Sequence, residues 1–400
     1  MMNADDRSIL SVTCYGHFLS HFNMLVFPAI LLPLSARLGL PMADTLQLGF
    51  YMYLLMGISA LPWGCLADRF GARPLLALFY GGAGLCGFGA ALFIDSPGAL
   101  KWALAGIGLF SGIYHPAGLG WIACCVSKTS RGMAYNGMFG NLGLALGPVL
   151  AGLTNYFRGP QAVYIGLGLL NLFGLVLLLK TGSHPVHQGV QTAEGRDDFA
   201  SWSSFAVLLV AMMLGGIVYR GATVTLPALF EIRGTGIHAS LSSLFRGHLS
   251  GNIVATGLTS CLYLVGMLGQ YAGGRAGERF DLRWSYLVFH VLTIPAALCI
   301  GLVTDIPLIL LATFHSFFLL GMQPIENTLV ARLTPSAMHG SAYGMKFVLT
   351  FGVGAVAVQI VRLVEQNLGV SSVFPVLGLI SIGLVLVIVL LIIKVPPLRS

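Results

Sequence analysis

The sequence predicts an all-α integral membrane protein in which twelve transmembrane helices form two pseudo-symmetric six-helix bundles. Composition is the first observation behind this fold class. Of the 400 residues, 56% are hydrophobic and 9% are charged, and the mean hydropathy of +0.86 lies outside the range of ordinary soluble domains. The second observation is a series of apolar runs of about 20 to 27 residues, long enough to cross a hydrocarbon core of about 30 Å. The third is internal repetition, which divides the chain into two matching halves.

Each apolar run is expected to be a helix, because the bilayer core offers no water to hydrogen-bond an open backbone. The predicted spans cover residues 9–36, 46–67, 75–94, 98–127, 133–157, 160–180, 203–230, 250–273, 284–304, 306–331, 340–364 and 370–394. Many of the 52 glycines lie inside these runs, where small residues let helix backbones approach closely.

A long polar stretch separates the first six spans from the last six. It predicts an amino-terminal bundle over residues 1–180, a cytoplasmic linker over 181–202 and a carboxyl-terminal bundle over 203–400. The segment 231–250, expected on the external side, is the other sizeable loop and has room for a short surface helix.

Basic residues set the expected orientation. Of the 21 Lys and Arg residues, 13 lie on the side of the two termini, six lie on the opposite side, and Arg220 and Lys346 lie within spans. The 13 are Arg7, Arg69, Arg73, Lys128, Arg131, Lys180, Arg196, Arg275, Arg279, Arg283, Arg332, Lys394 and Arg399. Because positive residues stay inside, we expect both termini in the cytoplasm, in a multi-pass protein of the cell's inner membrane.

A charged segment occurs once in each half. Residues 64–73 read GCLADRFGAR and residues 274–283 read GRAGERFDLR, so the Gly, the acid, Arg-Phe and the final Arg keep their places. The first copy resembles the loop signature Gly-x-Leu-Ala-Asp-Arg-x-Gly-Arg-Arg of major facilitator superfamily transporters.

That resemblance implies the fold of this superfamily and a gating role for the charged segment. It implies that Asp68 caps the start of the predicted helix 340–364 in one access state, and by the repeat that Glu278 does the same near Ser130. A carboxylate suits the unpaired N–H groups and positive dipole end of a helix. The alternative to a gating role is a structural one, in which the segment is a tight turn and its charges keep it in the cytoplasm. The gating candidates are Gly64, Asp68, Arg69, Gly71, Arg73, Glu278, Arg279 and Arg283.

Prolines repeat as well. Phe27-Pro28-Ala29 matches Leu226-Pro227-Ala228, and His115-Pro116 matches Gln323-Pro324. Proline frees a backbone carbonyl and bends a helix, which suits spans that line a cavity and rock during transport.

Few polar residues lie at membrane depth, and each is a functional candidate because its burial is costly. The predicted substrate contacts are His17, His21, Tyr114, His115, Tyr219, Arg220, His315 and Gln323. A histidine in such a place can instead bond a backbone carbonyl. Arg220 differs because it stays charged, so it is expected to supply a fixed positive charge to an anionic substrate.

Glu326 is the expected proton carrier, because it is a carboxylate placed inside a span. His21 is the alternative carrier, since imidazole titrates near neutral pH. A second alternative leaves Glu326 and Lys346 as a structural pair that neutralise one another across two helices.

The run Gly140–Gly152 contains the pattern Gly-x-x-x-Gly-Pro-x-x-Ala-Gly, so Gly143, Gly147, Pro148 and Gly152 are predicted to pack against another helix. The pattern also resembles a signature of drug and proton antiporters, although Gly106 stands about where many of these carry an arginine. With Gly16–His21 and the Gly112-x-x-His115-Pro116 motif, it resembles the fosmidomycin-resistance-type branch. This implies an exporter of small compounds, anionic ones among them.

The expected function is secondary transport of a small organic compound by alternating access, as efflux driven by protons. Uptake of a small organic anion with protons is the alternative within transport, and a membrane enzyme or receptor without transport is the alternative outside it. The sequence has no Ser-His-Asp, metal-ligand or phosphate-loop signature. We therefore expect no enzyme activity, cofactor, metal, nucleotide or nucleic-acid partner, and a monomer whose partners are the substrate, H⁺ and the lipid bilayer.

Overall fold

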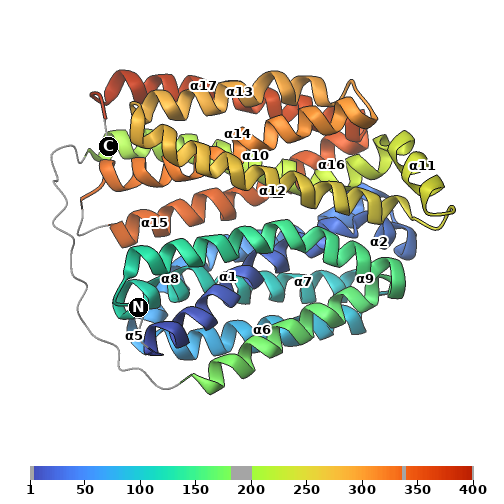
Figure 1. Cartoon of the computed structure of the whole chain (residues 1–400), viewed down its shortest axis with the longest axis horizontal. Coiled ribbons are helices and arrows are strands. Elements are labelled where there is room, and N and C mark those ends of the chain that lie inside the picture. Colours follow the sequence, from blue (N-terminus) through green and yellow to red (C-terminus); the bar gives the residue numbers. More distant parts are fainter. Residues whose placement is uncertain (1–3, 182–200, 336–338, 399–400) are drawn as a thin grey trace. The chain divides into compact units, whose positions relative to one another are not determined.

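The structure is a computed structural model that describes residues 4–181, 201–335 and 339–398. Within these ranges the regular elements are all helices (Figure 1). The chain divides into two compact units, Met1–Gln191 and Thr192–Ser400. The boundary between the units and most of the predicted linker lie outside the described residues.

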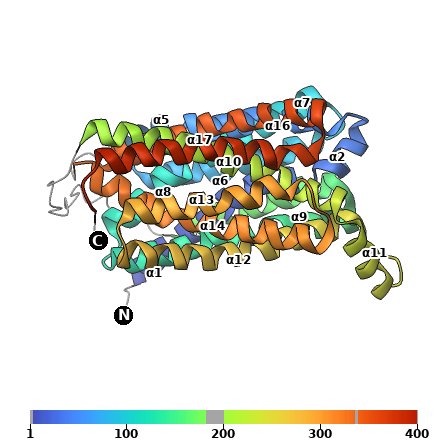
Figure 2. The same cartoon turned by 90° about the horizontal axis from the view of Figure 1, so that it is seen from above.

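The long helices of the amino-terminal unit run only roughly in one direction (Figures 1 and 2), and two breaks bend the chain by 50° and 44°. The helices of this unit are α1 (Ala4–Ala29), α2 (Leu31–Leu38), α3 (Met42–Gln47), α4 (Phe50–Ile58), α5 (Ala60–Phe70), α6 (Ala72–Leu92), α7 (Pro97–Ser111), α8 (Tyr114–Cys125) and α9 (Thr129–Lys180). The break between α1 and α2 bends the chain by 50° just after Pro28, where the ring of a proline opposes a straight helix.

The carboxyl-terminal unit is also a bundle of helices. Its α-helices are α10 (Trp202–Arg233), α11 (Thr235–Leu244), α12 (Gly251–Arg279), α13 (Leu282–Ile300), α14 (Asp305–Leu333), α15 (His339–Phe347), α16 (Val356–Leu368) and α17 (Val373–Lys394). Helix α11 falls in the predicted external segment and projects beyond the end of α12 in both views (Figures 1 and 2), which confirms the short surface helix.

The described residues account for all twelve spans. Eight helices are long and apolar enough to cross a membrane, and two bent pairs raise the number to ten. Helix α9 supplies two spans rather than one, because Gly159 interrupts it with φ 78° and ψ 173°, a conformation that favours glycine. Helices α7 and α8 supply the twelfth, since they follow one another across Gly112 and Ile113.

Two details differ from the sequence-based expectation. The segment 64–73 is mostly helical rather than a loop: α5 continues to Phe70, and the turn is concentrated at Gly71, which has φ 84°. The second copy is likewise helical to Arg279 in α12. The span predicted at 340–364 is irregular, with a π-helical turn at Val348–Gly352 and a 3₁₀ turn at Val353–Ala355 between α15 and α16.

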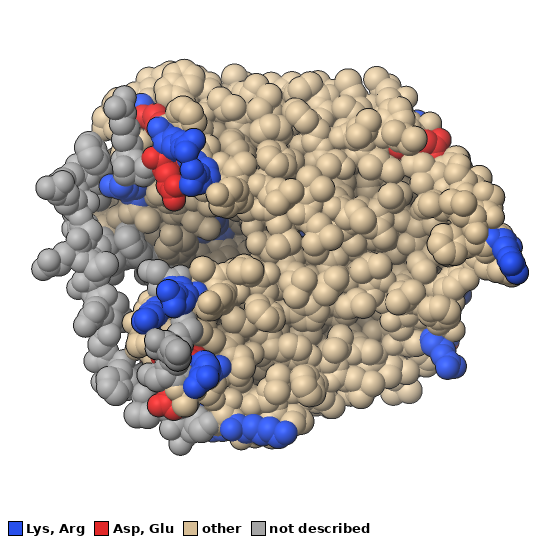
Figure 3. Space-filling model, in the orientation of Figure 1, with Lys and Arg blue, Asp and Glu red and all other residues tan. Residues whose placement is uncertain are grey.

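Charged residues gather near the helix ends in each unit, with a broad uncharged surface between them on the face drawn in Figure 3. Large apolar side chains are exposed along this middle zone, for example Leu85 at 68% and Leu92 at 73% on α6. An aqueous surface would make such exposure costly, whereas a lipid tail is as apolar as leucine. The chain is therefore a multi-pass membrane protein.

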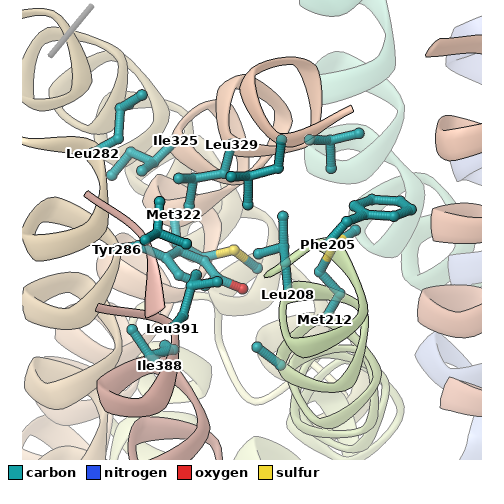
Figure 4. Packing of buried hydrophobic residues seen from close by; sticks show 14 of the residues in the cluster. Phe205, Leu208, Met212, Leu282, Tyr286, Met322, Ile325, Leu329, Ile388 and Leu391 are labelled. Atoms are coloured by element: carbon teal, nitrogen blue, oxygen red, sulfur yellow. The ribbon is translucent and has the colours of Figure 1, made fainter. Parts of the chain in front are cut away.

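The interior of the carboxyl-terminal unit is a packed apolar cluster from α10, α13, α14 and α17 (Figure 4). Its labelled members are Phe205, Leu208, Met212, Leu282, Tyr286, Met322, Ile325, Leu329, Ile388 and Leu391. Because lipid and protein interior are equally apolar, dispersion contact within the cluster stabilises the unit more than removal from water does.

Close packing of α9 on α1 positions the polar residues of the amino-terminal unit. A Cβ on Gly143 would lie 2.2 Å from the carbonyl oxygen of Phe18, and one on Gly140 would lie 2.6 Å from the His17 ring. Gly147 packs against Leu25 of α1, and Gly147, Pro148 and Gly152 are buried. This run therefore forms the small-residue face on which α1 rests.

Candidate functional site

Three histidines of the amino-terminal unit come together. His17 and His21 lie one turn apart on α1, and their Nε2 atoms are 3.2 Å from each other. His115 comes from α8, and its ring centre lies 5.3 Å from that of His17 and 5.6 Å from that of His21. One ligand nitrogen from each ring lies within 4.8 Å of the others. We call His17, His21 and His115 the histidine cluster.

Tyr114 and Asn136 hold the cluster in place. The Tyr114 hydroxyl donates to the Thr13 carbonyl oxygen over 2.7 Å and accepts from the Asn136 amide over 2.7 Å. The His17 Nδ1 atom lies 2.9 Å from the Asn136 carbonyl oxygen, and the His17 ring stacks on Tyr114. Tyr114 was predicted to touch substrate, but it has no exposed surface within the described chain, so here it positions His17.

A second polar group of this unit joins α1 to α7 and α9. The Asn23 and Asn171 side-chain amides exchange hydrogen bonds of 3.3 and 3.0 Å, and Asn23 also donates to the Ser111 hydroxyl over 3.1 Å. All three residues are buried. Hydrogen bonds between amide side chains of neighbouring helices hold membrane helices together.

In the carboxyl-terminal unit, Glu326 of α14 forms a buried ion pair with Lys346 of α15. Its Oε1 lies 2.8 Å from the Lys346 ammonium, and its Oε2 accepts a 2.9 Å hydrogen bond from Tyr286 of α13. The Lys346 ammonium also donates to the Asn327 side-chain oxygen. The side chains of Glu326 and Lys346 are only 3% and 9% exposed. The pairing proposed from the sequence is therefore present in this structure.

Two further histidines lie in the same unit. His290 of α13 packs edge-on against Tyr286, with ring centres 4.7 Å apart. His315 of α14 lies against Phe374, with ring centres 5.6 Å apart, and is fully buried. His315 is thus placed in packed interior rather than at an open surface of its unit.

Arg220 lies near the middle of α10 and is 3% exposed. Its neighbours Tyr219 and Thr223 line a small pocket, which α12 and α14 complete with Tyr263, Ser316, Leu319 and Leu320. Gln323, the repeat partner of His115, accepts a 2.9 Å hydrogen bond from Gln270 of α12.

The two charged segments share a contact that the sequence did not predict. Arg73 donates to the Thr181 carbonyl oxygen over 2.9 Å, at the end of α9. Arg283 donates to the Ile392 carbonyl oxygen over 3.1 Å and also to that of Val395, at the end of α17. In each unit the last Arg therefore satisfies free carbonyl groups at the end of that unit's final helix, where a cation is favourable.

Asp281 supports this contact in the second copy. It forms a 2.9 Å ion pair with Arg283 and accepts from the backbone N–H groups of Arg283 and Leu398. Burial raises the pKa of the Asp281 carboxyl, but these hydrogen bonds outweigh burial and hold the pKa below its ordinary value. Asp68, Arg69, Glu278 and Arg279 are exposed on their own units.

Sequence reasoning missed the residues that hold the candidates in place. These are Asn136, Asn171, Gln270, Tyr286 and Asn327. A uniform search for amides within apolar runs would have found the first two, because an unbonded amide is costly in a bilayer.

Comparisons with known proteins identify similar membrane transporters. The sequence matches the Major Facilitator Superfamily over residues 13–257. A Haemophilus influenzae protein, whose description provisionally assigns it metabolite transport, is 24% identical over 352 residues, which cover 85% of this chain and 84% of the relative. Efflux pump dotC of Dothistroma septosporum is 29% identical over 190 residues, which cover 44% of this chain and 32% of the pump.

Solved structures share the fold across the whole chain. The D-xylose-proton symporter superposes with a TM-score of 0.75 at 15% identity, covering 98% of this chain and 99% of the symporter. The human organic anion transporter MFSD10 superposes with a TM-score of 0.67 at 18% identity, covering 96% of this chain and 100% of the transporter. These matches confirm the predicted fold class. From its sequence and its fold, the chain belongs to the Major Facilitator Superfamily of transporters.

Proposed function

We propose that the protein is a secondary transporter that exports a small organic compound, an anion in the expected case, in exchange for protons. Two six-helix bundles, residues 1–180 and 203–400, would alternate access to a shared site while the segment 181–202 tethers them. Membership of the superfamily supports transport. Proton coupling, export and an anionic cargo are the parts that this proposal adds.

The observation that carries proton coupling is the buried ion pair between Glu326 and Lys346. A carboxylate at this depth is stabilised only while its cation and its hydrogen-bond donor remain in place. Protonation of Glu326 would remove the attraction that joins α14 to α15. Proton binding would then favour movement of α15, and movement of α15 would favour proton binding. Transport coupled to protons requires such a mutual dependence.

The irregular segment after α15 supports the same mechanism. Lys346 lies two residues before the π-helical turn Val348–Gly352, and a 3₁₀ turn follows at once. Regular intrahelical bonds are exchanged there for weaker or shifted ones, and such segments often mark functional hinges. Release of Lys346 would therefore act on a part of the helix that bends at low cost.

Arg220 is the proposed anchor for an anionic substrate. Its guanidinium keeps its charge in any environment, and Tyr219 and Thr223 line an adjacent pocket. Gln323 of the carboxyl-terminal unit would contribute a hydrogen bond to the substrate. The histidine cluster of the amino-terminal unit would supply further hydrogen-bond donors. His315 is fully buried against Phe374 and is the weakest of the proposed contacts.

The orientation that we propose places both termini in the cytoplasm of a cell bounded by this membrane. The 13 to 6 partition of basic residues supports it. Under this orientation α11 lies outside and the charged segments 64–73 and 274–283 lie inside.

Flux in proteoliposomes tests the proposal. A panel of radiolabelled small organic anions is loaded on either side, and a pH gradient of either sign is imposed. Antiport predicts that substrate moves against the proton flow, so reversing the gradient reverses net flux. Movement of substrate with the protons would replace export by uptake, and absence of flux for every compound at any gradient would contradict transport of this class.

A further inference from the structure

The histidine cluster has the composition of a metal site. It offers three imidazole nitrogens and no oxygen ligand, with the ligand atoms within 4.8 Å of one another. Imidazole suits borderline divalent metals such as Zn²⁺, Co²⁺, Ni²⁺ and Cu²⁺, whereas Mg²⁺ and Ca²⁺ take oxygen ligands. We propose that His17, His21 and His115 form a binding site for one divalent transition-metal ion within the amino-terminal unit.

The distance between the first two ligands fits this proposal. Two nitrogens bound to one tetrahedral Zn²⁺ at about 2.0–2.1 Å lie about 3.3 Å apart, and the Nε2 atoms of His17 and His21 are 3.2 Å apart. Their spacing of four residues on α1 is also the arrangement in which one helical face presents two imidazoles to a metal. A nitrogen of His115, within 4.8 Å of the other two, would have to approach to about 3.3 Å to complete three ligands.

The tautomer of His17 is set in the way a metal ligand requires. Its Nδ1 lies 2.9 Å from the Asn136 carbonyl oxygen, which can only accept, so Nδ1 carries the proton. The lone pair is therefore on Nε2, the atom that faces His21. An imidazole whose second nitrogen donates to a backbone carbonyl is the usual outer-shell arrangement around a bound metal.

The surroundings keep this geometry. Tyr114, bonded to Thr13 and Asn136, stacks on the His17 ring, and Gly140 of α9 leaves no room behind it. Three protein ligands leave one position open on a tetrahedral ion. Because neutral imidazoles bring no negative charge, an anion in that position would lower the cost of holding a dication in the bundle.

The sequence alone predicted no metal site, because His17 and His21 supply only two ligands and the third comes from a different helix. The inference deepens the proposed function, because the histidines would contact the substrate through the open position of the metal instead of donating hydrogen bonds to it directly. The metal site is nevertheless tested by equilibrium metal binding alone, without a measurement of transport. Transport can therefore fail while metal binding succeeds, and the reverse.

The test uses full-length protein purified in detergent with an affinity tag that contains no histidine, stripped with a chelator. Zn²⁺ is titrated in competition with a fluorescent chelator, with Mg²⁺ as the negative control. We expect one Zn²⁺ per chain, and an affinity at least about tenfold weaker in His21→Asn and in His115→Gln, the range typical for disturbing a metal site. His238→Gln on the external helix α11 and Cys124→Ser are the matched controls and should bind as wild type does.

A thiolate variant separates ligation from a structural role. His21→Cys should keep Zn²⁺ binding, because a thiolate is also a zinc ligand, and with Co²⁺ it should add a sulfur-to-metal charge-transfer band that the wild type lacks. A histidine that only supports the fold would give no such band. Failure of the folded wild type to bind one Zn²⁺, or binding that survives both His21→Asn and His115→Gln unchanged, would overturn the site.

Discussion

Arg220 is the residue that, in the function we propose, most restricts what this transporter can bind. A guanidinium that is 3% exposed inside its unit keeps a positive charge in place whether or not a substrate is present. An anion that reached it would form a charge-assisted hydrogen bond, and such bonds contribute about 1.5–3 kcal/mol.

We therefore expect Arg220→Ala to weaken binding of an anionic substrate by about 10- to 150-fold, the equivalent of that bond energy. Arg220→Lys should recover only part of the affinity, because an ammonium lacks the planar fork of Arg. Equilibrium binding to detergent-solubilised protein measures this, with the exposed Arg158→Ala as control. Normal binding by Arg220→Ala would remove the cationic site from the account.

Sequence reasoning reached some of these residues and not their partners. Helical periodicity alone places His17 and His21 on one face of α1. Whether His115 of α8 meets them depends on the rotation of two helices, which side-chain packing decides and spacing does not. In the same way, Glu326 and Lys346 could be named as a pair, but the Tyr286 hydroxyl that completes it was not found.

Helices α1 and α9 show how a small-residue pattern becomes a helix contact. The Cβ that alanine adds at Gly143 would lie 2.2 Å from the Phe18 carbonyl oxygen, and a backbone atom cannot move aside alone. Gly137 lies on the same helix with nothing within 4 Å of an added Cβ. The two positions form a matched pair for substitution.

Gly143→Ala is expected to destabilise the protein by about 1–3 kcal/mol, the usual cost of overpacking. Gly137→Ala should be neutral or slightly stabilising, because alanine is the better helix former. The melting temperatures of the two variants are compared in detergent, with size-exclusion chromatography as the measure of the fraction that remains folded. Equal melting temperatures for the two variants would show that the contact between α1 and α9 does not hold the unit together.

Element boundaries were predictable to within a few residues, because hydropathy marks where each helix must leave the membrane. The irregular turns of 348–355 were not, since nothing in a valine- and glycine-rich run distinguishes a π-helical turn from an α-helical one. The predicted span ended at residue 67, so the helical state of residues 68–70 was also missed. Charge was taken as a sign of a loop, although arginine favours helix.

At the scale of the whole molecule, the repeat is the main organising fact. Each unit ends its charged segment with an Arg that contacts carbonyl groups of its own last helix. This contact fixes the segment to its unit and leaves Asp68 and Glu278 exposed on their units. The gating hypothesis requires both carboxylates to be exposed, because each is expected to contact the other half.

Asp68→Asn should leave the protein folded but slow transport at least about tenfold, because a neutral amide interacts more weakly with the start of a helix in one access state. Glu278→Gln should have a smaller effect, since the second copy departs further from the signature. Initial rates at matched expression measure this. Equal rates for Asp68→Asn and wild type would reject the gating role.

Topology has an independent test. In a cysteine-free background, Ser183→Cys, which lies outside the described residues, should be protected from a membrane-impermeant thiol reagent in intact cells. Thr235→Cys at the start of α11 should react, because that residue is exposed and predicted to be external. Labelling of Ser183→Cys from outside would reverse the proposed orientation.

The central claim is that Glu326 carries the coupled proton, and the substitution Glu326→Gln tests it most directly. Glutamine keeps the shape and the hydrogen bond to Tyr286 but cannot exchange a proton. Because the change leaves Lys346 without its carboxylate, the variant is first checked for folding, and Glu326→Gln with Lys346→Met is measured beside it. Asp95→Asn, at an exposed ion pair with Arg37, is the control.

The measurement is substrate flux in proteoliposomes, once under a pH gradient and once as exchange of labelled for unlabelled substrate without a gradient. For Glu326→Gln we predict that flux driven by the pH gradient is abolished, while substrate binding and exchange persist. Asp95→Asn should behave as wild type. If Glu326→Gln still responds fully to the pH gradient, the proton is carried by His21 or another histidine, and Glu326 only pairs with Lys346.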